Sequence, residues 1–228
     1  MNAVTTKRLP FAPVVSTRRL EALLHRDRKD IERIASHAGR YYKPFDLQRP
    51  GSTKWRHIDN PTEELTKLQA NIYRAIFATY DFPSNIVGGI HGRSIKDNMS
   101  EHLGQPVLVT MDIKECFPHI HDLHHVFPMF RRLGFSSEVA GLLTKLTTFQ
   151  HRLPQGAPSS SIIANLVMEP VHREINKIAR AYGLHWTMYV DDIAISGARA
   201  RDAIIPVIRA LQREGYGVAH RKIHVMSN

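Results

Sequence analysis

The stretch MYVDDIAIS at residues 188–196 decides how the rest of the sequence is interpreted. It joins two short runs of apolar and β-branched residues, 186–190 and 193–196, through the acidic pair Asp191 and Asp192. Runs of this length and composition are typical of β-strands, and aspartates are common in tight turns. The stretch therefore predicts a β-hairpin that carries two carboxylates at its turn.

A third carboxylate, that of Asp112, lies near the end of another apolar strand, predicted over residues 107–113. Asp112 precedes Asp191 by 191 − 112 = 79 residues, so only the fold can bring the two together. A charge at the end of a buried strand is costly unless it is paired or bound to a metal. Carboxylates on adjacent strand ends suit Mg²⁺, and two such ions can activate an attacking oxygen and stabilise a leaving one. The sequence predicts a site for two Mg²⁺ ions, with Mn²⁺ as the alternative cofactor.

The remaining pattern mixes helices and strands without a regular alternation, which favours an α+β fold. Residues 41–60 are basic and contain two prolines, and we predict that they are irregular. A helix is predicted to follow, with Asn60 as its cap and Pro61 at its first position. Pro170 is expected to kink or split a longer helix that starts near residue 159. Further helices are predicted over residues 17–37, 121–133, 136–148 and 200–213, and a last strand from about residue 217.

The overall charge points to a polyanionic partner. Lys and Arg total 31 against 21 for Asp and Glu, which gives a formal net charge of +10. A surplus of this size attracts phosphate backbones. The single cysteine, Cys116, excludes a disulfide within the chain and suits a reducing compartment. Because no apolar run has the length of a membrane span and no signal core is evident, we expect a cytoplasmic protein without a membrane partner.

Five segments, taken together and in this order, resemble the reverse transcriptases, and most closely the bacterial retron type. The similarity covers the chain from about residue 50 to its end. The segments are GSTKWR at 51–56 with NP at 60–61, GRSIKDN at 92–98, DIKECFP at 112–118, LPQGAPS at 153–159 and YVDD at 189–192.

The resemblance implies the fingers and palm of a right-hand polymerase, with an antiparallel palm sheet packed on helices. Residues 1–50 are then an N-terminal helical and basic extension, and residues 51–106 are the fingers. Residues 107–228 are the palm, with a fingers insertion near 121–152. We expect the thumb to be absent from this chain.

The resemblance also assigns roles at the acidic site. Asp112 and Asp191 are expected to hold both metals, with support from Asp192 and a backbone carbonyl ligand from Ile113. Phe117 lies five residues past the first aspartate, where the family places a bulky ring that excludes a 2′-hydroxyl. Plain core packing is the alternative role for Phe117.

A second group of residues is expected to contact the incoming nucleotide. By the same resemblance, Gln155 touches the nucleotide, and Gly156 allows close approach of the backbone. The basic side chains of Lys54, Arg56 and Arg93 are expected to reach the triphosphate through charge-assisted hydrogen bonds. A simple turn at Gln155 and a solvated basic loop are the alternatives.

The retron subtype rests on the string NMSEH at residues 98–102, where retron enzymes carry Asn-Ala-x-x-His. Asn98 and His102 match that pattern, and Met99 replaces the alanine. On a helix, Asn98 and His102 share one face, and we expect both to bind RNA. The Val-Thr-Gly string of the family does not occur in this sequence.

A zinc site is the alternative for the histidine-rich segment after Cys116. Its spacing lacks a paired-ligand signature, and Cys116 lies within the DIKECFP segment, so zinc is not favoured. The histidines concerned are His119, His121, His124 and His125.

The sequence thus predicts an RNA-directed DNA polymerase that copies a structured non-coding RNA into DNA from dNTPs. Priming from a 2′-hydroxyl and a role in antiviral defence are family expectations, as is a defence effector as partner. Two alternatives stay open. One is a palm module that binds RNA with weak or no catalysis, and the other is a split enzyme whose thumb comes from another chain.

Overall fold

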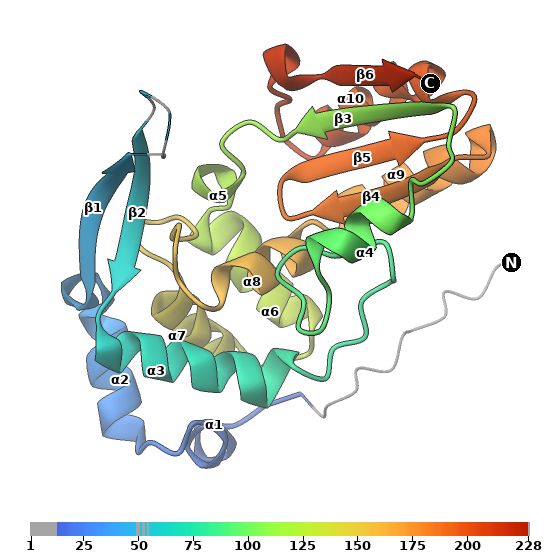
Figure 1. The fold of residues 1–228 in the computed structure, drawn as a ribbon. Helices are drawn as coiled ribbons and strands as arrows, with labels where there is room; N and C mark the ends of the chain where they lie inside the picture. Colours follow the sequence, from blue (N-terminus) through green and yellow to red (C-terminus); the bar gives the residue numbers. More distant parts are fainter. Residues whose placement is uncertain (1–12, 49–50, 52, 54, 228) are drawn as a thin grey trace, which may run out of the picture. The chain divides into compact units, whose positions relative to one another are not determined.

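The computed structural model describes residues 13–48, 51, 53 and 55–227. The chain divides into two compact units (Figure 1). The first unit comprises the described parts of residues 1–82 together with residues 121–159. The second comprises residues 83–120 and the described part of residues 160–228. Residues 83–106, which the sequence analysis assigned to the fingers, therefore group with the strands of the second unit, and the fingers boundary stays a prediction.

The first unit is mainly helical around an apolar core. Residues 17–37 were predicted as one helix, but they form two, because His25 adopts a left-handed conformation (φ 52°). The side chain of Asp27 then caps the second helix by accepting a hydrogen bond from the Asp30 amide at 2.9 Å. The helices are α1 (Thr17–Leu24), α2 (Arg28–Ser36), α3 (Glu63–Ile72), α6 (Phe127–Arg132) and α7 (Ser137–Thr147), with π-helical turns at Tyr73–Phe77 and Asp122–Val126 and a 3-10 turn at Ala38–Tyr41. The fully buried side chains include Leu20, Leu24, Ile31, Ile34, Leu65, Leu68, Phe130 and Phe135.

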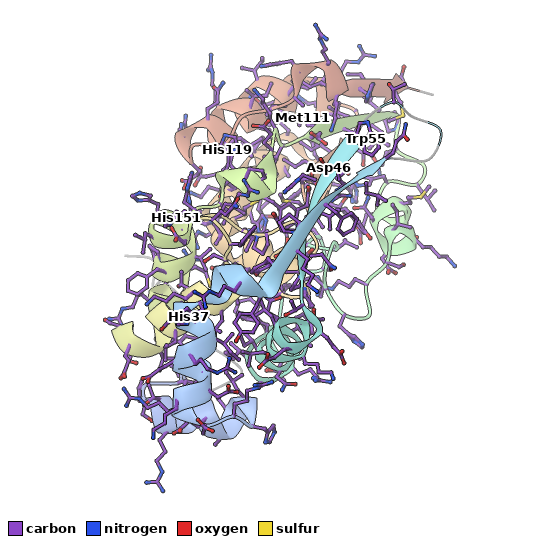
Figure 2. All side chains as sticks on the ribbon, turned by 90° about the vertical axis from the view of Figure 1, so that its left-hand side faces the viewer. His37, Asp46, Trp55, Met111, His119 and His151 are labelled. Atoms are coloured by element: carbon purple, nitrogen blue, oxygen red, sulfur yellow. The ribbon has the colours of Figure 1, made fainter. Side chains whose placement is uncertain are left out.

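The first unit also carries a β-hairpin that the sequence analysis did not predict. Strands β1 (Tyr42–Gln48) and β2 (Trp55–Pro61) pair antiparallel over their whole length. Asp46 and Trp55 lie on this hairpin (Figure 2). The prediction of an irregular segment was wrong because prolines are tolerated in a sheet that consists only of edge strands. Asn60 and Pro61 belong to β2, so Thr62 takes the N-cap position of α3 instead of Asn60.

The second unit is built on a four-stranded antiparallel sheet. Its strands are β3 (Val107–Asp112), β4 (His185–Tyr189), β5 (Asp192–Ser196) and β6 (His224–Ser227), in the spatial order β4-β5-β3-β6. Helices α9 (Glu169–Tyr182) and α10 (Ile204–Arg213) pack together on this sheet (Figure 1). The remaining elements are α4 (Ile95–Ser100), α5 (Cys116–His119), α8 (Ser160–Val167) and the 3-10 turns Ala200–Ala203 and His220–Lys222. The combination confirms the predicted α+β class with an antiparallel sheet.

Two sequence predictions concern breaks in this second unit. The helix predicted from residue 159 is split at Met168, and Pro170 sits in the first turn of α9, where its missing N–H costs nothing. The strand predicted from about residue 217 starts later, at His224. Val218 makes only an isolated bridge to Ile113 before the chain turns.

The described part of the chain contains no helix that is both long enough and apolar enough to cross a membrane.

Candidate functional site

The three carboxylate-bearing residues lie at one end of the second unit's sheet. The register of β3 and β5 pairs Asp112 directly with Asp192. The amide of Ile113 donates to the carbonyl oxygen of Asp191 at 2.9 Å, which extends the pairing by one step. The fold thus closes the gap of 79 residues between Asp112 and Asp191 that the sequence leaves open.

The turn that presents Asp191 is tight and strained. Tyr189 pairs with Asp192, so only Val190 and Asp191 connect β4 to β5. Val190 has a φ of 61°, which is rare for a β-branched residue and places it in the left-handed region that primed hairpin turns require. The surrounding structure must hold this conformation, because valine does not favour it.

Gly88 and Asn165, for which no role was predicted from the sequence, provide that support. A Cβ on Gly88 would lie 2.3 Å from the amide nitrogen of Val190, so only glycine lets the two backbones approach this closely. The buried Asn165 donates its side-chain N–H to the carbonyl oxygen of Gly88 at 2.8 Å. The pattern of three glycines at 88, 89 and 92 signals only a loop, since the approach becomes visible only in the fold.

Asp112 is paired with a lysine of its own unit. The ammonium of Lys222 lies 2.5 Å from Oδ2 of Asp112, whose side chain is 14% exposed. The oxygen donors of the three aspartates fit a hard divalent cation in their chemistry. Among the residues that the structure describes, however, no group of three or more His, Cys, Asp or Glu side chains is gathered closely enough to hold a metal. A divalent cation bound by Asp112 would compete with the ammonium of Lys222 for the carboxylate.

Phe117 and Cys116 follow the first aspartate on the short helix α5. Phe117 is 7% exposed and is largely packed among its neighbours, and its role at the sugar stays a prediction. The Cys116 thiol points at the sulfur of Met168 at 3.8 Å. Burial, together with the charges of Asp191 and Asp112, raises the pKa of Cys116 to about 12. The thiol is therefore protonated and packs as an apolar group.

The first unit gathers three of the residues predicted to contact the nucleotide. The side-chain amide of Gln155 makes two hydrogen bonds when its nitrogen faces the carbonyl oxygen of His57 (2.8 Å) and its oxygen faces the Arg56 guanidinium (3.2 Å). Gly156 has a φ of 115°, and a Cβ there would lie 3.0 Å from Ile58. The backbone at Gly156 is therefore reserved for glycine. Lys54 lies outside the described residues.

A buried carboxylate that was not predicted from the sequence, that of Asp59, contacts this group. The Asp59 side chain accepts a hydrogen bond from the backbone amide of Gln155 at 3.1 Å and another from the guanidinium of Arg152 at 3.3 Å. Gln155 lies 96 residues beyond Asp59 in the chain, so no local pattern could have shown the contact.

Arg93 and the two residues predicted to bind RNA lie in the second unit. Arg93 donates to the carbonyl oxygens of Pro83 and Ile86 and braces its own loop. Helix α4 ends at Ser100, so His102 lies beyond the helix, and the expectation that it shares a helical face with Asn98 is wrong.

His102 connects its loop to the sheet. Its Nδ1 lies 2.7 Å from Oγ of Ser196, and its Nε2 lies 2.7 Å from Oγ1 of Thr187. Both ring nitrogens are therefore engaged by hydroxyl groups of β4 and β5, and RNA binding by His102 stays a prediction. Burial lowers the pKa of His102, which favours the neutral ring that these two hydroxyl contacts can satisfy.

A family model described as "Reverse transcriptase (RNA-dependent DNA polymerase)" matches residues 47–228. The chain is 31% identical to the retron Se72 reverse transcriptase of Salmonella heidelberg, over 81% of this chain and 48% of the relative. It is 30% identical to the retron Ec86 reverse transcriptase of Escherichia coli (73% and 54%) and 29% identical to the retron Mx65 reverse transcriptase of Myxococcus xanthus (89% and 50%).

The chain thus spans about half the length of the curated relatives that it matches. The family match covers both of the segments that carry the paired aspartates and the segment that carries Gln155. On the strength of this match, and of the aspartates that the sheet pairs, the chain belongs to the reverse transcriptase family.

Proposed function

We propose that the protein acts as a retron-type, RNA-directed DNA polymerase that copies a structured non-coding RNA into DNA. The observation that carries the proposal is the pairing of Asp112 with Asp192 across β3 and β5, with Asp191 in the adjoining turn. Three carboxylates at one sheet end are the donors that a nucleotidyl-transfer site needs.

In this proposal Asp112 and Asp191 hold two divalent cations, Mg²⁺ or Mn²⁺, with Asp192 and the carbonyl oxygen of Ile113 as further ligands. When bound, such ions activate the primer hydroxyl and stabilise the leaving pyrophosphate. The strained turn at Val190 and its support by Gly88 keep Asp191 in place before any cation arrives. Preorganisation of this kind is a main source of catalysis in phosphoryl transfer.

The residues of the first unit are proposed to bind the dNTP. Arg56 supplies a fixed charge for the triphosphate, and Gln155 contacts the nucleotide, with Gly156 keeping the backbone open. Lys54 and Arg93 are proposed to add charge, although Arg93 also braces its loop. Phe117, in the second unit, is proposed to exclude the 2′-hydroxyl of ribonucleotides.

The net charge of +10 supports binding of the RNA template and the growing DNA. Asn98 is proposed to contact the RNA, whereas the contacts of His102 suit it to position the surrounding loop. We place the reaction in the bacterial cytoplasm, with a defence effector as a candidate protein partner.

A primer-extension assay tests the proposal. The chain is given an RNA template, a primer, dNTPs and Mg²⁺, with and without candidate partner chains, and RNA binding is measured in parallel. The proposal is supported if the wild-type chain synthesises DNA and the Asp191→Asn variant does not. Tight RNA binding without synthesis under every condition would instead identify an RNA-binding module.

A further inference from the structure

Asp59 on β2 is a buried carboxylate, with a side chain only 2% exposed. Its partners all lie within the first unit. Oδ2 accepts from the amide of Gln155 at 3.1 Å, and Oδ1 lies 3.3 Å from Arg152 and 3.4 Å from Nε2 of His57. A buried carboxylate is tolerated only with partners of this kind, so the site is built around its charge.

The link between Asp59 and Gln155 runs in both directions. The amide of Asp59 donates to the carbonyl oxygen of Gln155 at 2.8 Å, and the amide of Gln155 donates back to the Asp59 side chain. Two hydrogen bonds between the same two residues fix both the distance and the orientation of the Gln155 backbone. The Gln155 side chain is thereby directed along β2, where it meets Arg56 and the His57 carbonyl.

Arg152, the cationic partner of Asp59, is itself held in place. Its amide and carbonyl exchange hydrogen bonds with Phe149 at 3.0 and 2.8 Å across a two-residue turn. The ring of Phe149 stacks on Tyr42 at the base of the hairpin, with ring centroids 4.4 Å apart. The loop that leads into Gln155 is therefore tied to β1 by ring stacking and to β2 by Asp59.

We infer that Asp59 is the positioning residue that sets Gln155 and Arg56 as one rigid nucleotide-contacting unit. Asp59 is buried behind them, so it acts through the loop and does not itself touch the nucleotide. The inference rests on the proposed polymerase function for its kinetic consequence, but the structural link can be measured without activity.

Hydrogen exchange measures the link directly. Asp59→Ala removes every side-chain contact, and we expect backbone amides of residues 152–156 to exchange at least about tenfold faster. Asp59→Asn keeps an acceptor for the Gln155 amide and should give an intermediate change. The matched control is Asp46→Asn, which alters an exposed aspartate on the same hairpin that hydrogen-bonds only to His57 among the described residues. The inference would be overturned if Asp59→Ala left the exchange rates of these amides unchanged. It would also be overturned if Asp46→Asn raised the rates as much as Asp59→Ala does.

Steady-state kinetics of primer extension test the consequence for nucleotide binding. We expect Asp59→Ala to raise the KM for dNTP about tenfold, with a smaller effect on kcat, since the residue positions contacts to the nucleotide. Asp59→Asn should recover part of the loss. In a Gln155→Ala background the effect of Asp59→Ala on KM should largely disappear, because the Gln155 side chain, through which Asp59 also orients Arg56, is already gone. Additive effects, or a fall in kcat alone, would show a general structural role.

The two hypotheses can fail separately. If the wild-type chain extends no primer, alone or with partner chains, the proposed function fails, and hydrogen exchange alone decides the role of Asp59. If the chain polymerises normally and Asp59→Ala changes neither exchange nor KM, the positioning role fails and the polymerase function stands.

Discussion

The ammonium of Lys222 lies 2.5 Å from Oδ2 of Asp112, the residue that β3 pairs with Asp192 of β5. The charge of Asp112 is therefore balanced by a lysine of the same chain that lies 110 residues away in sequence. A divalent cation that uses the Asp112 carboxylate must compete with this ion pair.

Replacing Lys222 should make cation binding easier. In Lys222→Met, Asp112 loses its partner, so we expect Mn²⁺ or Mg²⁺ to raise the melting temperature at severalfold lower concentration than in the wild type. The measurement is thermal unfolding over a cation titration, in which the stabilisation reports binding to the folded state. Lys177→Met is the matched control, because Lys177 is an exposed lysine of the same unit that pairs with Glu174. Equal cation dependence in the two variants would contradict competition at Asp112.

Replacing Asp191 should separate catalysis from RNA binding. Asp191→Asn removes a charge from the proposed cation site, so we expect primer extension to fall below detection. RNA affinity should stay close to the wild-type value, since the basic surface dominates it. Asp202→Asn, at an exposed aspartate paired with Arg199, serves as control and should preserve both. Parallel loss of extension and RNA affinity in Asp191→Asn would show that the substitution acts by unfolding.

The hairpin at 186–196 could be predicted from sequence because the signals are local: two short apolar runs and a turn between them. The hairpin formed by β1 and β2 could not. Its prolines, Pro44 and Pro61, normally break a strand, and pairing to a partner strand overrides that preference. The single helix predicted over 17–37 failed for a different reason. Its apolar spacing continues across the break, while His25 ends the first helix in a left-handed conformation and the side chain of Asp27 caps the second.

The candidate site likewise contains residues that could be predicted from the sequence and residues that only the fold shows. Asp112, Asp191 and Asp192 were predicted because each stands next to an apolar strand in a recognisable motif. Asp59 and Lys222 carry no such signal, since their partners lie 96 and 110 residues away. The contacts of His102 could not be predicted either, because only the fold brings its ring nitrogens to Ser196 and Thr187.

The stability of the chain should depend on pH through a buried histidine of α9. His172 is 7% exposed, and burial, with a contribution from the charge of Arg173, lowers its pKa from 6.5 to about 3. Above pH ~6.5 the ring is neutral in both states, and its full contribution to stability is present. As pH falls from there towards 3, the unfolded chain binds a proton that the folded chain excludes. The free energy of unfolding then decreases by up to ~1.4 kcal/mol per pH unit.

Denaturant unfolding between pH 7 and pH 4.5 measures this effect. His172→Leu should show a smaller loss of stability on acidification than the wild type, even if it is less stable at pH 7. His220→Leu, at an exposed histidine of the same unit, should keep the wild-type slope. A slope in His172→Leu that equals the wild-type slope would assign the acid sensitivity to other groups.

Phe117 has two candidate roles, and one pair of substitutions separates them. If the ring excludes a 2′-hydroxyl, Phe117→Val should raise the use of ribonucleotides relative to deoxynucleotides by at least about tenfold, because the smaller side chain opens space at the sugar. If the ring only fills the core, Phe117→Val should lower stability without changing the choice of sugar. Phe135→Val is the control, since Phe135 is a fully buried phenylalanine of the first unit with no predicted contact to the nucleotide.

The two measurements are the ratio of kcat/KM for a matched deoxynucleotide and ribonucleotide, and the melting temperature. We expect both variants to melt at lower temperature and only Phe117→Val to admit ribonucleotides. Unchanged discrimination in a folded, active Phe117→Val variant would leave core packing as the role of this ring.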